Sequence, residues 1–226
     1  MKKPGIKHIF FDLDHTLWDF ETNSAITFEK IFKACNVDLQ VDKFMTHYTP
    51  INHRYWKMYR ENKIEQSYLR YSRLKDTFQA VNFEADDQLI DLLSNQYIEN
   101  LSNETALLPY AKEILNYLGD KYQLHIITNG FDIIQYKKLK NSAIDTFFKT
   151  VTTAEEVQLK KPHPKVFYHA LDKAQAHKKE SLMIGDNLEA DIQGAIQIGM
   201  QAIHLSDDKN RYKKSITQLD ELMRIL

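Results

Sequence analysis

Two aspartates, Asp12 and Asp14, are the residues whose type and spacing point most clearly to chemistry. They follow the apolar run Ile9-Phe10-Phe11, which is typical of a strand covered on both faces in a parallel sheet. Ligands of such sheets bind beyond the carboxyl ends of the strands. We therefore expect both carboxylates at a strand end, where they can bind a hard cation, attack an electrophile or transfer a proton. Two aspartates at this spacing also fit a simple polar turn, so the motif alone does not establish a catalytic site. Further motifs in the sequence are needed to distinguish the two interpretations.

The composition is that of an ordinary globular protein, because 43% of the 226 residues are hydrophobic and 27% are charged. A chain of this length forms one large domain, or a domain with an insert. Its net charge of -1 gives no reason to expect binding to nucleic acid polymers. Cys35 is the single cysteine, so no internal disulfide can form. We expect a soluble, cytoplasmic protein without a membrane span, and the sequence leaves open whether it is a monomer or a homodimer.

Two kinds of pattern divide the chain. Residues 20–103 show apolar side chains at helical spacing, for example Leu89, Leu92 and Leu93, and contain Pro50 but no glycine. This stretch predicts several amphipathic helices packed as a bundle. From residue 108 onward, strand-like and helix-like runs alternate. The predicted strands are 124–127, 147–152, 182–184 and 201–205, and the predicted helices are 109–118 (with Pro109 in the first turn), 132–139, 164–174, 189–198 and 219–225.

Alternating strands and helices predict an α/β fold, a doubly wound parallel sheet with helices on both faces. We expect residues 1–18 and 105–226 to form this Rossmann-like core. Residues 19–104 form an α-helical cap inserted after the first strand, on the side of Asp12 and Asp14. Since the insert leaves the core at the catalytic edge, we expect it to cover the site, although a purely structural appendage is the alternative.

Polar groups of suitable types follow three of the predicted strands. Asp12 follows the first, Thr128 ends the second, and Gly185-Asp186 follows a third. A fourth polar element is the loop around Lys161 and Pro162, which precedes a helix. Their joint occurrence is far more specific than any one of them.

With these motifs the chain resembles the haloacid dehalogenase-like (HAD) superfamily of phosphohydrolases over nearly its whole length. The matching motifs are D-L-D-H-T at residues 12–16, I-I-T at 126–128, Lys161-Pro162, and G-D-N-L-E-A-D at 185–191. The resemblance implies a HAD-like core with a helical cap. The chain departs from the commonest pattern at His15, where many members have glycine. We expect this change to narrow the turn or to add a contact.

The resemblance implies a catalytic role for four residues. Asp12 is the nucleophile that forms an acyl phosphate, and Asp14 protonates the leaving oxygen and then takes a proton from water. Lys161 binds the phosphate as a point cation, and Thr128 donates its hydroxyl to a phosphate oxygen. Asn129 is a candidate substrate ligand or a residue that only shapes the loop.

The resemblance also implies Mg²⁺ as cofactor, because several carboxylates would otherwise repel a phosphate. Asp12 and Asp186 would bind the ion through their carboxylates, and Asp14 through its main-chain carbonyl. Asp191 is interpreted as an outer ligand or a support for Lys161, with a helix-capping residue as the alternative.

The expected partner is a small phosphorylated substrate. Residues 14–20 and 127–130 resemble those of the YjjG-type pyrimidine 5'-nucleotidases, which implies a (non-canonical) pyrimidine nucleoside monophosphate as substrate. In this resemblance Trp18 and the two residues after it lie near the leaving group. The segment 48–71 is rich in tyrosine and arginine, and Arg73 follows it. It fits either an aromatic helix-pair core with a basic outer face or a pocket that stacks a base.

Three other functions stay open. Another small-molecule HAD phosphatase, of sugar phosphate or phosphoglycolate type, would carry the same motifs. A 2-haloacid dehalogenase shares the fold but needs no metal and no second aspartate, so Asp14 together with Asp186 argues against it. A non-catalytic scaffold would be expected to have lost one of the motif residues, and all are present.

Overall fold

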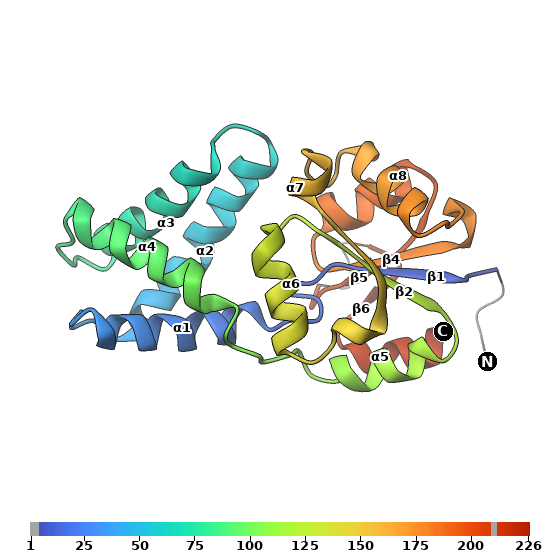
Figure 1. Cartoon of the computed structure of the whole chain (residues 1–226), viewed down its shortest axis with the longest axis horizontal. Coiled ribbons are helices and arrows are strands. Elements are labelled where there is room, and N and C mark those ends of the chain that lie inside the picture. Colours follow the sequence, from blue (N-terminus) through green and yellow to red (C-terminus); the bar gives the residue numbers. More distant parts are fainter. Residues whose placement is uncertain (1–4, 209–211) are drawn as a thin grey trace. The chain divides into compact units, whose positions relative to one another are not determined.

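The computed structural model describes residues 5–208 and 212–226 and divides into two compact units (Figure 1). The first comprises the described residues of Met1–Phe20 and Thr105–Leu226, and the second is Glu21–Glu104. None of the described helices combines the length and the apolarity that crossing a membrane requires.

The first unit is built on a parallel sheet. Its strands in the described chain are β1 (His8–Phe11), β2 (Gln123–Thr128), β3 (Phe148–Thr153), β4 (Ser181–Gly185), β5 (Gln201–Leu205) and β6 (Ser215–Ile216). They lie in the order β3-β2-β1-β4-β5-β6, and each neighbouring pair is parallel. The chain thus builds one side of the sheet from β1 to β3 and then crosses to β4 on the other side. This reversal at β1 creates the switch point at which α/β sheets bind their ligands.

Helices cover both faces of the sheet, with α5 and α8 on opposite sides in Figure 1. The α-helices of this unit are α5 (Ala111–Gly119), α6 (Asp132–Asn141), α7 (Ala154–Val157), α8 (Pro164–Lys173), α9 (Gly194–Gln197) and α10 (Leu222–Ile225). Short 3-10 helices at Asp145–Phe147, Lys178–Glu180 and Leu219–Glu221 and a π-helix at Leu188–Gln193 complete it. The doubly wound α/β fold predicted from the sequence is therefore confirmed.

Two predicted helices differ in detail. Pro109 lies outside α5, because Tyr110 adopts a left-handed conformation with φ of 66° and the helix begins at Ala111. The helix predicted at 189–198 is instead a π-helix followed by α9. The short elements β6 and α7 were not predicted, since two and four residues carry no periodic signal.

The sheet is buried because its strands are apolar on both faces. Phe10 of β1 and Met183 of β4 pack with Val166 and Phe167 of α8 on one face, and all four are fully buried. Burial of such side chains stabilises the fold by about 1.5–3 kcal/mol each. This packing holds the strand ends, and hence the residues that follow them, in fixed positions.

The second unit is a bundle of the helices α1 (Phe20–Ala34, whose first residue belongs to the first unit), α2 (Val41–Arg60), α3 (Gln66–Ala80) and α4 (Asp87–Leu101). Its interior is an aromatic cluster in which Phe28 contacts Phe44, Tyr48 and Tyr97 with ring centroids 4.6–4.8 Å apart. The helical spacing of residues 20–103 predicted several packed helices, and the structure has four helices in this segment.

The basic side chains of this bundle do not all lie outside it. Arg73 is 2% exposed, donates to Asn52 Oδ1 over 2.9 Å and lies 5.0 Å from the centre of the Tyr97 ring. Arg54, in contrast, is exposed and pairs with Asp76. The basic outer face considered for this segment therefore does not include Arg73, whose charge is stabilised by tyrosine rings.

Candidate active site

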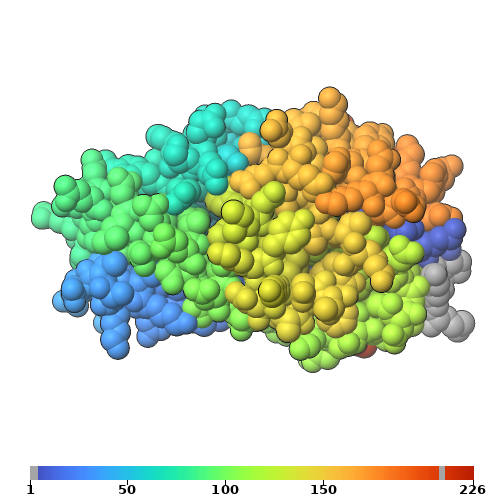
Figure 2. Space-filling view, in the orientation of Figure 1, coloured from blue at the N-terminus to red at the C-terminus, as the bar shows by residue number. Residues whose placement is uncertain are grey.

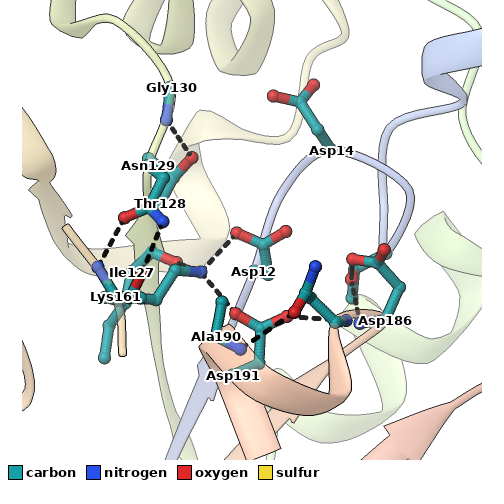
Figure 3. Close-up of polar contacts among 12 residues, drawn as sticks. Asp12, Asp14, Ile127, Thr128, Asn129, Gly130, Lys161, Asp186, Ala190 and Asp191 are labelled. Atoms are coloured by element: carbon teal, nitrogen blue, oxygen red, sulfur yellow. Dashed lines mark hydrogen bonds and ion pairs between the residues drawn. The ribbon is translucent and has the colours of Figure 1, made fainter. Parts of the chain in front are cut away.

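Three neighbouring strands deliver polar side chains to one edge of the sheet. Asp12 follows β1, Thr128 ends β2 and Asp186 follows β4, as Figure 3 shows. The backbone N–H of Asp12 still donates to the carbonyl of Ile184 over 2.9 Å, so the carboxylate is held by the last rung of the sheet. The strand-end rule therefore predicted correctly that these residues share one edge.

Lys161 lies at the centre of the site. Its Nζ is 2.6 Å from Asp12 Oδ1, 2.7 Å from Asp191 Oδ1, and donates to the carbonyl of Ile127 over 2.6 Å. The side chain is only 2% exposed, and burying an unpaired ammonium group is costly. Burial alone lowers the pKa of Lys161, but the charges of Asp12 and Asp191 outweigh it, and the pKa is raised. Lys161 is therefore a fixed cation beside Asp12.

Three carboxylates surround this single ammonium group. Asp12, Asp186 and Asp191 each offer an oxygen within 4.8 Å of the others. Burial, reinforced by Asp191 and Asp186, raises the pKa of Asp12 well above its usual range, although Lys161 opposes the shift. Burial and the charge of Asp191 raise the pKa of Asp186 to about 7. If all three carboxylates are ionised, their charge exceeds what Lys161 neutralises, and their oxygens are the ligands that Mg²⁺ prefers. These residues fit a magnesium ion.

The π-helix after β4 places Asp191. Asp191 Oδ2 accepts from the backbone N–H of Asn187 over 3.0 Å, and Asn187 caps the helix by accepting from Ala190 N–H over 2.9 Å. Asn187 is the N-cap of this helix, and Asp191 accepts from the backbone N–H of that cap residue. Asp191 is 1% exposed and faces Lys161, which is the contact proposed for it.

The turn after Asp12 is tight, because the carbonyl of Leu13 accepts from the backbone N–H of Leu17 and of Trp18, each over 2.9 Å. His15 in this turn has φ of 62°, a left-handed conformation that favours glycine. This explains physically why a glycine suits the position. His15 also adds a contact, since its ring lies 4.9 Å from that of Phe20.

Asp14 lies apart from the carboxylate cluster, and its side chain points away from Asp12 in Figure 3. It is held by two residues of α6. Gln135 Nε2 donates to Asp14 Oδ2 over 3.0 Å, and Lys138 Nζ lies 2.6 Å from Asp14 Oδ1. Both α6 residues are buried. Neither was among the sequence candidates, because helix 132–139 was interpreted only as a covering element.

Thr128 and Asn129 have different surroundings. Thr128 Oγ1 accepts from Gly130 N–H over 3.1 Å and from Gln135 Nε2 over 2.7 Å, which leaves its hydroxyl hydrogen available to an acceptor. The Asn129 amide forms two hydrogen bonds with the backbone of Lys161, to its carbonyl over 3.0 Å and from its N–H over 2.7 Å. Asn129 thus shapes the lysine loop, one of the two roles considered for it.

The family model for haloacid dehalogenase-like hydrolases matches residues 9–205, and the chain belongs to this family. The resemblance inferred from the motifs is thereby confirmed.

Individual relatives match most of the chain. Pyrimidine 5'-nucleotidase PynA of Streptococcus pneumoniae is 32% identical over 200 residues, which cover 87% of this chain and 82% of that protein. Pyrimidine 5'-nucleotidase YjjG of Escherichia coli is 29% identical over 199 residues, with coverages of 88% and 85%. The HAD-hydrolase YfnB of Bacillus subtilis is 28% identical over 225 residues, with coverages of 96% and 94%. The crystal structure of YfnB bound to magnesium, which reveals interdomain movement, matches 98% of both chains with a TM-score of 0.87.

Proposed function

We propose that this chain is a Mg²⁺-dependent phosphomonoesterase that acts through an aspartyl phosphate on Asp12. The observation that carries the proposal is the buried group of Asp12, Lys161, Asp186 and Asp191, in which one carboxylate at a strand end faces a fixed cation. This arrangement pairs a nucleophile with positive charge for a phosphate, which are the two requirements of the reaction.

Asp12 performs the first chemical step. One of its oxygens attacks phosphorus, a P–O bond forms, and the ester P–O bond breaks. Asp14 gives its proton to the leaving alkoxide. In the second step Asp14 takes a proton from a water molecule, whose oxygen attacks the same phosphorus. The bond between Asp12 and phosphorus then breaks, and inorganic phosphate leaves.

Two residues stabilise the charge of the transferring phosphoryl group. Lys161 is fixed by three oxygen atoms, so its ammonium group needs little reorganisation during the reaction. Thr128 accepts two hydrogen bonds and can donate its own hydroxyl to a phosphate oxygen. When bound, Mg²⁺ would be held by Asp12, Asp186 and the Asp14 carbonyl, and would supply Lewis-acid charge neutralisation.

We infer further that the substrates are pyrimidine nucleoside 5'-monophosphates, including non-canonical ones. Two relatives that match more than four fifths of the chain are named pyrimidine 5'-nucleotidases, which supports this substrate class. We assign the helical unit the role of a cap that selects the leaving group, because it is inserted directly after the turn that carries Asp14. A sugar phosphate or phosphoglycolate phosphatase is the second candidate.

The experiment that tests this function is a phosphate-release assay on purified protein with a panel of nucleoside monophosphates and sugar phosphates. We expect the highest kcat/KM with a pyrimidine monophosphate, and loss of activity in a chelator that added Mg²⁺ restores. Asp12→Asn keeps the shape of the side chain but removes the nucleophile, so we expect kcat to fall by about 10³-fold or more. Circular dichroism of the variant controls for folding.

Each outcome bears on a different part of the proposal. Full activity of Asp12→Asn would refute the aspartyl-phosphate mechanism. Activity that is unaffected by the chelator would refute the metal requirement. A preference for a sugar phosphate over every pyrimidine monophosphate would refute the substrate class and leave the mechanism intact. Release of halide from a 2-haloacid without phosphatase activity would favour the dehalogenase.

A further inference from the structure

Helix α6 presents two very different faces. This segment reaches the surface shown in Figure 2. Its outer side carries Ile133 and Tyr136, which are 70% and 48% exposed. Its inner side carries Gln135 and Lys138, which lie one turn apart and are almost completely buried. A polar pair is normally placed on the outer side of such a helix, and burying it is unfavourable unless it is fully engaged. Because Gln135 and Lys138 are buried on the inner side, they need hydrogen-bond or ion-pair partners, and these partners lie in the candidate active site.

Gln135 connects two residues of the proposed reaction. Its Nε2 donates one hydrogen to Thr128 Oγ1 over 2.7 Å and the other to Asp14 Oδ2 over 3.0 Å. The phosphate-binding hydroxyl and the acid–base carboxylate thus lie within two hydrogen-bond lengths of each other. Gly130 makes this possible, because a Cβ atom there would lie 2.4 Å from Cδ of Gln135. The glycine, the glutamine and the threonine therefore fit together as one unit.

Lys138 fixes the second oxygen of the same carboxylate. Its Nζ lies 2.6 Å from Asp14 Oδ1, and the side chain is 3% exposed. The ammonium group also lies 4.2 Å from the centre of the Trp18 ring and 5.4 Å from that of Phe20. Two aromatic faces and one carboxylate leave this cation little freedom to move. Asp14 is consequently held at both oxygens by donors from a single rigid helix.

We propose that Gln135 and Lys138 are positioning residues that hold the Asp14 carboxylate in one orientation and at a set distance from Thr128, and so from the phosphate that Thr128 would bind. This inference rests on the proposed phosphatase function. An acid–base group must lie within hydrogen-bond distance of the oxygen to which it gives a proton. That oxygen is attached to the phosphorus whose other oxygens Thr128 binds. By connecting Thr128 to Asp14, Gln135 sets the distance between the phosphate and its proton donor, and Lys138 sets the direction of the carboxylate.

The test compares two substrates whose leaving groups differ in whether they must be protonated as they depart. The leaving group of uridine 5'-monophosphate is an alkoxide, which has to be protonated, whereas p-nitrophenyl phosphate releases a stable phenolate. We expect Lys138→Met to lower kcat for uridine 5'-monophosphate by about 100-fold and kcat for p-nitrophenyl phosphate by less than about 5-fold. Both KM values should change by less than about 3-fold, since Lys138 does not bind the phosphate. Lys138→Arg should restore part of the lost kcat.

A control variant, a second test variant and a crystal structure separate positioning from folding. Lys137→Met removes the neighbouring charge from the exposed side of α6 and should leave both kcat values unchanged. Gln135→Met tests the same inference if Lys138→Met does not fold, and we expect the same selective loss. The crystal structure of Lys138→Met is a measurement that needs no activity, and it should show the Asp14 carboxylate displaced from Gln135.

The outcomes distinguish this inference from the proposed function. Equal losses of kcat on both substrates, an increased kcat, or an Asp14 carboxylate that does not move would overturn the positioning role alone. A wild-type protein that hydrolyses neither substrate would overturn the phosphatase function and this inference with it.

Discussion

At the scale of single residues, the side chain of Asn129 shows how the site is kept in order. Its amide pairs with both backbone groups of Lys161, although 31 residues separate the two in the chain. The Asn129 side chain thus hydrogen-bonds to both the N–H and the C=O of one residue, as a neighbouring strand does in a sheet. It therefore fixes the segment from which the Lys161 ammonium group reaches Asp12.

We predict that Asn129→Ala weakens both stability and catalysis. The two Lys161 backbone groups lose their partners, which should lower the free energy of unfolding by about 1–3 kcal/mol. Because Lys161 would be held less firmly, kcat should also fall. Urea unfolding and steady-state kinetics measure the two effects. Asn116→Ala, on the exposed side of α5, is the matched control. Unchanged kcat and stability in Asn129→Ala would show that these hydrogen bonds have no such role.

The sequence predicted some of these residues and could not predict others. Asp12, Thr128 and Asp186 were predictable because each ends or follows an apolar run, and the edge of a parallel sheet brings strand ends together. Gln135 and Lys138 carried no such signal. Three lysines occur between residues 137 and 140 of α6, and only packing decides which of them faces inward.

At the scale of elements, the turn from β4 into the π-helix depends on a close approach. A Cβ atom on Gly185 would lie 2.3 Å from Asp191 Oδ2, far inside contact distance. Asp191 cannot move away cheaply, because it is buried and holds both Lys161 and the backbone N–H of Asn187. The glycine is required here by space and not by its backbone angles.

Gly185→Ala should therefore destabilise the protein and damage the site together. We expect a loss of about 1–3 kcal/mol in the free energy of unfolding from overpacking, with a lower kcat because Asp191 no longer supports Lys161. Thermal unfolding and kinetics test both effects. Gly119→Ala is the control, since the nearest atom to its Cβ would be Phe147 Cδ1 at 3.9 Å. We expect that variant to be as stable as the wild type or more stable by about 0.4–1 kcal/mol. If the two variants behaved alike, the steric argument would fail.

The elements themselves were predictable to different degrees. The strands from β1 to β5 were found because each has four or more residues and is rich in apolar or β-branched side chains. The π-helix was not, since its apolar spacing does not distinguish i→i+5 hydrogen bonds, such as that from Ile192 N–H to the carbonyl of Asn187, from those of an α-helix. The start of α5 was misplaced because Pro109 is a strong helix-start signal, and the left-handed Tyr110 after it leaves no mark in the sequence.

At the scale of the whole molecule, the strand order explains why the site can be assembled from distant segments. Residues 12, 128 and 186 come from β1, β2 and β4, which are neighbours in the sheet and far apart in the chain. The alternation of strands and helices predicted a parallel sheet. It did not predict which strands are neighbours, because that depends on the non-local packing of helices such as α8 on the sheet. The site is therefore as stable as the sheet that assembles it.

The stability of this sheet should depend on pH through His125. This residue lies in β2, between the strands β1 and β3. Its Nε2 is 3.2 Å from His8 Nδ1 of β1 and its Nδ1 is 2.9 Å from Thr150 Oγ1 of β3, while its ring stacks on Phe10. Burial, with a smaller effect of His8, lowers the pKa of His125 to about 4. In the unfolded chain the pKa of a histidine is about 6.5. Between these values the unfolded state binds a proton that the folded state does not.

Acidification should consequently favour unfolding within this window and have no such effect above it. The contribution of His125 is complete above pH of about 6.5 and is lost as the pH falls toward about 4, a change of up to about 3 kcal/mol. Urea unfolding at several pH values measures it. His125→Gln should lower stability at neutral pH and should flatten the decrease between pH of about 6.5 and 4.5 relative to the wild type. His177→Gln, which removes an exposed histidine, should leave the decrease unchanged. Because the wild type and His125→Gln share every other titrating residue, parallel curves for these two proteins would mean that His125 is not kept neutral by the sheet.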